Sequence, residues 1–267
     1  LANKCDLVKK TKIEANKEKL CDFIEEYYEE GLDIIPTIAQ KGVNLEYVVK
    51  SMLDNIKDYK SNINDKLYGI VIRSFDINKP NIGIDKYKGG VLGGSIKSGL
   101  LKIGDYIQIN PGIVKFDKKL KVWKAEPVVT QVESLNADKT SLEYAIPGGL
   151  IGIGTTLDPS LCKSNKCVGQ HITHFNKNPK IVYEIDISYM RFKRDKKVKL
   201  EKNDKILVGN AGNIIEAVIL KKRKNKLKLT LKAPIYLNTK RVCLISDKDT
   251  KMIVIGIANI DGYKLVE

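Results

Sequence analysis

The segment YGIVIRSF, residues 68–75, decides the fold class, because a short and mostly apolar run bounded by turn-forming residues is typical of a β-strand. Four more runs of this kind follow, separated by Gly, Pro, Asn and Asp: residues 89–96, 105–109, 128–135 and 150–155. No helical pattern longer than two turns lies between them. We therefore predict an all-β barrel or sandwich over residues 63–175.

A second set of short strands follows the polar segment at residues 176–179. Its runs are residues 181–189, 204–208, 213–220, 227–231, 241–246 and 252–260. The same reasoning predicts a second all-β barrel domain over residues 176–267. A polar stretch at residues 58–66 predicts a linker before the first β domain.

Upstream, residues 1–62 alternate between helix and strand patterns. Thr11 and Glu14 have the spacing of a capping box and precede an amphipathic helix of about five turns. An apolar run at residues 32–36 fits a buried strand, and Asn44 is placed to cap a second helix. The predicted buried face of that helix consists of Val48, Val49, Met52, Leu53 and Ile56. This order of elements predicts the end of an α/β sheet domain.

Charge is concentrated in the last third of the chain. The 267 residues carry 47 Lys and Arg against 32 Asp and Glu, a formal net charge of +15. Residues 1–170 hold 25 basic and 22 acidic side chains, whereas residues 171–267 hold 22 and 10. Such an excess favours a polyanionic partner, nucleic acid before an anionic membrane, although a solvated Lys-rich surface has the same composition.

Localisation is predicted from what the sequence does not contain. No stretch approaches 18 uninterrupted apolar residues, and the first ten residues do not have the pattern of a secretory signal. The five cysteines are scattered rather than dense and even in number. We expect no membrane partner and a reducing, cytoplasmic setting.

Two polar loops follow the predicted strand ends near the N-terminus. In Asn3-Lys4-Cys5-Asp6, the Asp6 carboxylate is suited to accept hydrogen bonds from the ring N–H and the exocyclic amine of guanine. Asn3 is suited to bridge the loop and the base, and the Lys4 stem to lie over the base. The second loop, Ile38-Ala39-Gln40, offers the Ala39 N–H to the guanine carbonyl oxygen. Turn and cap chemistry alone is the alternative interpretation of both loops.

At these residues the chain resembles a known family. Asn-Lys-x-Asp at residues 3–6 and Ala-Gln at residues 39–40 resemble two guanine-recognition motifs of translational GTPases. Four longer runs resemble the gamma subunit of eukaryotic and archaeal translation initiation factor two: residues 72–80, 88–96, 147–155 and 157–162. The first 62 residues would then be the C-terminal part of a P-loop GTPase domain, followed by the two β-barrel domains.

The resemblance implies a GTP-dependent carrier of methionyl initiator tRNA to the small ribosomal subunit, acting in a heterotrimer with alpha and beta subunits. It implies that GTP or GDP, with Mg²⁺, is bound in the complete protein. The implied guanine-binding residues are Asn3, Lys4, Cys5, Asp6, Ile38, Ala39 and Gln40. No role with DNA is implied.

This sequence departs from the family in places that matter for catalysis. It contains no Gly-x4-Gly-Lys-Ser/Thr phosphate loop, no switch segments and no Asp-x-x-Gly. We therefore expect no catalytic residues in this chain, no GTP hydrolysis by it alone and no tight nucleotide binding. Ile38 stands where the family usually has Ser, which removes a hydroxyl near the base.

Glycine-rich segments of the first β domain are candidate tRNA contacts, because a missing side chain lets a nucleic-acid backbone approach closely. The candidates are Arg73, Gly93, Gly94, Gly148 and Gly149. The glycines would otherwise turn barrel corners, and Arg73 would pair with a carboxylate at the edge of the core.

The basic run at residues 221–224 predicts the exposed tip of a hairpin, with the question of RNA contact left open. Cys162, Cys167, His171 and His174 suggest zinc, but the His spacing is shorter than in the usual sites. We therefore expect no metal there.

Two other functions compete with the initiation factor. One is an elongation-type carrier of aminoacyl-tRNA, which the glycine-rich runs at residues 89–94 and 147–152 disfavour. The other is a basic β-barrel module that binds RNA or protein without nucleotide. A comparison of initiator tRNA binding with elongator tRNA binding distinguishes the initiation factor from the elongation-type carrier. The variant Asp6→Ala tests the guanine assignment.

Overall fold

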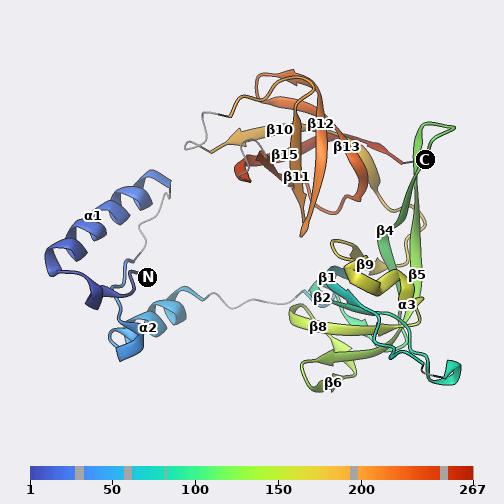
Figure 1. The fold of residues 1–267 in the computed structure, drawn as a ribbon, viewed down its shortest axis with the longest axis horizontal. Coiled ribbons are helices and arrows are strands. Elements are labelled where there is room, and N and C mark those ends of the chain that lie inside the picture. The colour runs from blue at the N-terminus through green and yellow to red at the C-terminus, as the bar shows by residue number, and fades with distance from the viewer. Residues whose placement is uncertain (28–32, 57–61, 82, 193–197, 247–251, 267) are drawn as a thin grey trace. The chain divides into compact units, whose positions relative to one another are not determined.

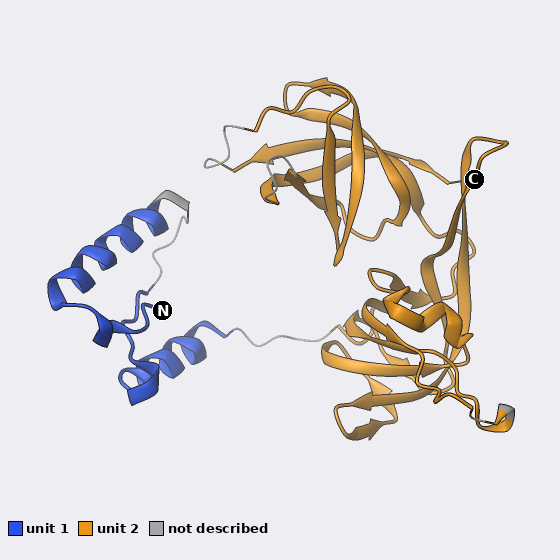
Figure 2. Cartoon of the chain, in the orientation of Figure 1, with its two compact units in different colours: residues 1–60 blue, residues 61–267 orange. Residues whose placement is uncertain are grey.

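The computed structural model describes residues 1–27, 33–56, 62–81, 83–192, 198–246 and 252–266 (Figure 1). The chain divides into two compact units, residues 1–60 and residues 61–267 (Figure 2). Part of the linker predicted at residues 58–66 lies outside the described residues. None of the described helices is long and apolar enough to cross a lipid bilayer.

The described part of the first unit is built from two α-helices and two 3-10 turns. In chain order they are η1 (Cys5–Leu7), α1 (Lys10–Tyr27), η2 (Ala39–Lys41) and α2 (Leu45–Asn55). Two extended segments join them through a parallel bridge between Ala2 and Pro36. In its described part, the predicted strand at residues 32–36 contributes only this bridge.

Local predictions for both helices need correction. The capping box was wrong, because the amides of Lys12 and Ile13 donate to the carbonyl of Lys9, at 2.9 and 3.2 Å, and Thr11 lies inside the first turn. Asn44 does precede α2, but its side chain donates to the Pro36 carbonyl at 2.8 Å instead of capping the helix.

The predicted buried face of α2 was also mostly wrong. Only Val48 is buried, and the other four side chains are 55–67% exposed: Val49, Met52, Leu53 and Ile56. The described part of the first unit has too few elements to cover an apolar stripe of this width.

The first barrel of the second unit closes as predicted for an all-β domain. Six strands follow the order β4-β9-β1-β2-β8-β5 and close through pairing of β4 with β5, while β6 extends the sheet beside β5. Its elements are β1 (Tyr68–Phe75), η3 (Ile84–Lys86), β2 (Val91–Ser98), β3 (Leu101–Lys102), β4 (Tyr106–Asp117), β5 (Val122–Ala137), β6 (Thr140–Leu142), β7 (Tyr144–Ala145), β8 (Gly148–Thr155), α3 (Pro159–Cys162), η4 (Lys163–Asn165) and β9 (His171–His174). Its core is aliphatic, with Leu92, Ile107 and Ile153 fully buried.

The second barrel closes in the order β10-β13-β12-β11-β14-β15. Its strands are β10 (Ile181–Arg191), β11 (Lys205–Asn210), β12 (Asn213–Arg223), β13 (Lys226–Tyr236), β14 (Arg241–Ser246) and β15 (Ile253–Leu265). Alternate residues of each strand point inward, as the buried Leu227, Leu229 and Leu231 of β13 illustrate. The predicted fold of two successive β-barrels is confirmed.

Candidate functional site

The two predicted guanine loops lie side by side in the first unit. The amide of Ala2 donates to the Ile35 carbonyl at 2.9 Å, and the amide of Thr37 donates to the Ala2 carbonyl at 2.9 Å. These bonds hold the two extended segments parallel, so both loops leave at the same end. This arrangement was expected, because the carboxyl ends of parallel strands meet at one edge of a sheet.

Asn3 joins the two loops directly. Its side-chain oxygen accepts a hydrogen bond from the Ala39 N–H at 3.1 Å and another from the Thr37 hydroxyl at 3.2 Å. The Ala39 N–H, which the sequence suggested for a guanine carbonyl, is therefore occupied by Asn3 in this structure. Thr37, only 3% exposed, is a supporting residue to which the sequence pattern assigned no role.

Asp6 faces a cation that the sequence did not single out. Its carboxylate lies 3.7 Å from the Lys41 ammonium group, and both side chains remain accessible to solvent, at 27% and 66% exposure. Lys41 directly follows Gln40, but a lysine in an exposed loop is too common to be a signal by itself. The ion pair adds a further link between the two loops and fixes the Asp6 carboxylate beside them.

The remaining loop residues shape the backbone. Lys4 adopts a left-handed conformation with φ of 64°, which turns the chain into η1. The Cys5 thiol donates to the Ala2 carbonyl at 3.0 Å. Ile38 is bridged to Val43, and this bridge closes the second loop around Gln40. The seven predicted residues thus form one loop pair.

On the first barrel, the exposed Arg73 lies beside half-buried glycine backbone. Arg73 of β1 is in register with Gly93 of β2, which in turn is in register with Gly152 of β8. A Cβ atom added to Gly93 would lie 3.6 Å from the Arg73 Cβ atom, so both positions face the same side. A polyanionic strand crossing this face would meet a guanidinium group next to glycine backbone that the Phe75 ring partly covers.

The other three candidate glycines lie elsewhere. A Cβ atom at Gly94 would come within 2.2 Å of the Ile70 carbonyl oxygen, so this glycine is required by packing. Gly148 and Gly149 begin β8 with φ of 122° and 56°, and both are exposed with open space around them. They lie four and three residues, or about 13 and 10 Å, along β8 from Gly152. The predicted tRNA candidates therefore occupy two places on the barrel.

The residues considered for zinc serve the structure in different ways. Cys162 is fully buried, and the Cys167 amide donates to the Ser74 hydroxyl at 3.1 Å. His171 is 2% exposed, lies 3.0 Å from the Tyr68 hydroxyl through Nδ1, and packs its ring against Tyr236 of the second barrel. Burial lowers the pKa of His171 to about 4, so it is neutral at pH 7. Within the described ranges no group of three metal-ligating side chains is close enough to hold an ion.

The basic run at residues 221–224 does form the tip of a hairpin, between β12 and β13. Several lysines of this hairpin pair with carboxylates on neighbouring segments: Lys222 with Glu201 at 3.4 Å, Lys228 with Glu184 at 3.2 Å, and Lys232 with Glu216 at 2.6 Å. Much of the positive charge at the base of this hairpin is thus compensated within the barrel.

Comparisons with known proteins identify relatives of this chain. No family model matches the chain. Eukaryotic translation initiation factor 2 subunit 3 of Drosophila melanogaster is 35% identical over 280 residues, which cover 100% of this chain and 58% of the relative. Eukaryotic translation initiation factor 2 subunit gamma of Schizosaccharomyces pombe is 35% identical over 249 residues, which cover 88% and 55% of the two chains.

Solved structures show the same fold at low identity. Translation elongation factor SelB from Methanococcus maripaludis, in complex with the GTP analogue GppNHp, superposes with a TM-score of 0.75 at 17% identity, over 98% of this chain and 58% of that chain. A bacterial selenocysteine-specific elongation factor gives a TM-score of 0.70 at 18% identity, over 98% and 39%. The predicted order of an α/β segment followed by two β-barrel domains is confirmed as a fold.

The chain spans a little over half the length of the curated relatives it matches, 58% and 55%. The sequence match to the Drosophila relative runs through both loops and both barrels, since that alignment covers the whole chain. The chain is therefore a homologue of the gamma subunit of translation initiation factor two.

Proposed function

We propose that this chain forms part of a GTP-dependent carrier of methionyl initiator tRNA. In this proposal residues 1–62 recognise guanine, while the barrels at residues 63–175 and 176–267 bind tRNA and the alpha and beta subunits and reach the small ribosomal subunit. Homology to the gamma subunit over the whole chain supports the proposal. The homology also favours an initiation factor over an elongation-type carrier and over a nucleotide-independent module.

The observation that carries the nucleotide half of the proposal is the hydrogen bond from Ala39 to Asn3. It brings Asn3, Lys4, Cys5 and Asp6 next to Ile38, Ala39 and Gln40, as a guanine site requires. Asp6 accepts from the guanine N–H groups, and the Lys4 stem covers the base. The phosphate-loop motif does not occur in this sequence. We therefore assign no ligand in it to the phosphates of GTP or GDP or to Mg²⁺.

A change of preference from guanine to xanthine tests the guanine site. An Asp6→Asn side chain offers an N–H₂ donor where the carboxylate only accepts, so it should favour xanthine, whose C2 substituent is an oxygen. Titration of the chain with guanosine and xanthosine, followed by NMR, should show a guanosine preference that Asp6→Asn reverses. Adenosine should not bind, because a site built around matched hydrogen bonds binds a base that lacks them about 100-fold or more weakly.

Two controls make the result decisive. GDP should bind no more than about tenfold tighter than guanosine if the chain provides only base contacts. Asp33→Asn, an exposed carboxylate of the same unit, should leave the preference unchanged. Equal binding of guanosine, xanthosine and adenosine by the unmodified chain would refute the guanine site.

The tRNA half of the proposal is supported by the exposed Arg73 beside Gly93 and by the exposed Gly148 and Gly149. Arg73→Glu should weaken binding of methionyl initiator tRNA about tenfold, because one phosphate contact becomes a repulsion. Lys97→Glu, on an exposed position of the same barrel, is the matched control. An equal decrease of affinity in both variants would mean that only net charge matters.

A further inference from the structure

Two strands of the first barrel run on beyond it as a separate ribbon. Past the irregularity between Ile109 and Ile113, β4 and β5 remain paired only to each other, from Ile113↔Glu126 to Asp117↔Val122 (Figure 1). We call residues 113–126 the β4–β5 arm. None of the guanine or tRNA candidates lies on it.

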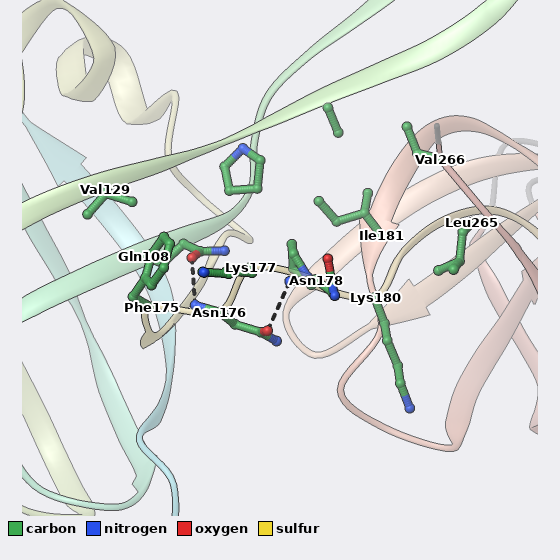
Figure 3. A pocket seen from close by; sticks show the side chains of 13 residues that line it. Gln108, Val129, Phe175, Asn176, Lys177, Asn178, Lys180, Ile181, Leu265 and Val266 are labelled. Carbon is green, nitrogen blue, oxygen red and sulfur yellow. Dashed lines mark hydrogen bonds between the residues drawn. The ribbon is translucent and has the colours of Figure 1, made fainter.

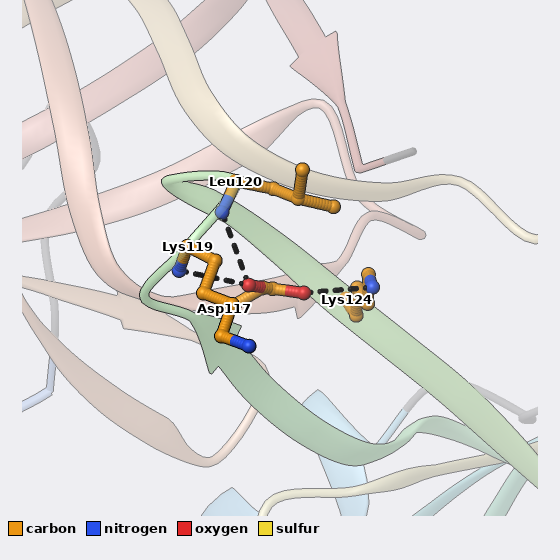
Figure 4. Close-up of polar contacts among 4 residues, drawn as sticks. All are labelled: Asp117, Lys119, Leu120 and Lys124. Atoms are coloured by element: carbon orange, nitrogen blue, oxygen red, sulfur yellow. Dashed lines mark hydrogen bonds and ion pairs between the residues drawn. The ribbon is translucent and has the colours of Figure 1, made fainter.

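The tip of the arm is ordered by one carboxylate. Asp117 accepts hydrogen bonds from the amides of Lys119 and Leu120, at 3.0 and 3.1 Å, and from the Lys124 ammonium group at 2.9 Å (Figure 4). The hydrogen bond from Lys124 is the largest cause of a pKa of Asp117 below its usual value. The turn is thus fixed in the free protein, which reduces the entropy cost of binding a ligand.

The arm carries a large excess of positive charge. Residues 115–124 contain five lysines against Asp117 alone: Lys115, Lys118, Lys119, Lys121 and Lys124. Of these, only Lys124 has an ion pair among the residues that the structure describes. Lys118, Lys119 and Lys121 are exposed around the turn. This differs from the β12–β13 hairpin, where neighbouring segments supply carboxylates.

One face of the arm is aromatic. Phe116 and Trp123 are directly opposite in register, with ring centroids 5.1 Å apart and planes at 64°. Phe116 is 47% exposed, so part of its ring is open to solvent. Edge-to-face packing of the pair holds both rings in place, so they need no reordering to receive a planar group.

The aromatic face continues into a groove at the base of the arm. Residues alternate between the faces of a strand, so Ala125, Pro127 and Val129 lie on the same face of β5 as Trp123. These three residues line a cavity of about 630 Å³ whose opposite wall comes from residues 175–181 (Figure 3). Lys177 and Lys180 belong to that wall. Aromatic and apolar surface is thus flanked by lysines from the tip of the arm to the groove.

We propose that the β4–β5 arm and this groove bind a single-stranded segment of RNA. Bases stack on Phe116 and Trp123, and the lysines of the turn and of the groove wall neutralise the phosphates. Stacking platforms inside a positively charged track are how proteins hold unpaired strands without reading their sequence. The proposal goes beyond the carrier function and does not depend on the guanine loops.

Binding is measured on the full chain with a fluorescein-labelled 12-nucleotide oligouridine RNA. Trp123 is the only tryptophan of the chain, so its fluorescence reports stacking directly. We expect quenching of Trp123 with the same midpoint as the rise in RNA anisotropy. Phe116→Leu with Trp123→Leu should weaken binding about 5- to 150-fold, the range for one stacked base.

Charge reversal at the turn tests the phosphate contacts. The triple variant Lys118→Glu, Lys119→Glu and Lys121→Glu should weaken binding and reduce the slope of log K against log salt by about 0.7 for each phosphate that is no longer neutralised. The matched control is Lys221→Glu, Arg223→Glu and Lys224→Glu, which makes the same change of charge at another hairpin tip. Circular dichroism and thermal unfolding check that each variant is folded.

Several results would overturn the proposal. They are unchanged Trp123 fluorescence at saturating RNA, an equal decrease of affinity in the two triple variants, and equally tight binding of polyglutamate or of anionic phosphatidylserine vesicles at the arm. Because Asp6→Asn does not alter the arm, failure of guanine recognition with intact RNA binding would refute the proposed function and leave this inference standing.

Discussion

The Ala39 amide donates to the Asn3 side-chain oxygen at 3.1 Å, across 36 residues of chain. We expect Asn3→Ala to free the second loop, because it removes the side chain that accepts from both Ala39 and Thr37. Hydrogen exchange of the Ala39 amide should accelerate about fivefold, the equivalent of one net hydrogen bond. Asn55→Ala, at an exposed position at the end of α2, should not change it. Unchanged exchange in Asn3→Ala would mean that the loops do not depend on this bond.

Gly93 and Gly94 are adjacent but should respond differently to a methyl group. In Gly94→Ala the new Cβ atom would lie 2.2 Å from the Ile70 carbonyl oxygen, and we expect the free energy of unfolding to fall by at least about 2 kcal/mol. In Gly93→Ala the nearest atom is at 3.5 Å, so stability should stay within about 0.5 kcal/mol. Urea unfolding of both variants checks this. Equal stability of the two would contradict the packing role of Gly94.

Ser74 holds α3 and the following turn against β1. Its hydroxyl donates to the Cys162 carbonyl at 2.8 Å and accepts from the Cys167 amide at 3.1 Å, and the side chain is 2% exposed. Ser74→Ala leaves two buried backbone groups without a partner, which should cost about 1–3 kcal/mol. Reaction of Cys162 and Cys167 with a thiol reagent should also accelerate. Ser98→Ala, at a more exposed hydroxyl, should change neither measurement by as much.

His171 makes stability depend on pH. Its pKa is lowered to about 4 by burial, whereas the unfolded chain titrates near the usual 6.5. The unfolded state therefore binds more protons between these values, and stability falls as pH decreases through this window. At pH 5 the decrease relative to pH 7.5 should be about 2 kcal/mol. In His171→Phe, the difference in unfolding free energy between the two pH values should be smaller by this amount. An unchanged difference would show that the pH dependence does not come from His171.

Much of the fold followed from local patterns. Short runs such as residues 68–75 and 241–246 coincide with β1 and β14, because turn residues bound them on both sides. The extension of β4 to Asp117 was not predicted, since Pro111 interrupts the pattern and the strand continues through an irregularity in its pairing. β9 was missed because its residues, HITH, are polar in part and are buried only by tertiary packing.

The candidate site was predictable only as far as backbone topology determines it. That residues 3–6 and 38–40 would meet followed from two neighbouring strand ends. The ion pair of Asp6 with Lys41 and the occupation of the Ala39 amide by Asn3 did not, because both depend on side-chain conformations that a sequence pattern does not specify. The same limit applies to the arm, where the pairing register alone brings Phe116 opposite Trp123.

Closure of the two barrels restricts how other molecules recognise them. Among the described strands, twelve close the two barrels, six in each barrel. Each of these twelve strands pairs with a neighbouring strand on both sides. The β4–β5 arm and β6 keep open outer edges, but over the closed parts of the barrels a partner has no open strand edge to extend with a strand of its own, the route by which exposed sheets capture peptides and also nucleate aggregates. Recognition must instead use outward side chains, turns and grooves, so binding partners can change by surface substitution while the barrel framework stays the same.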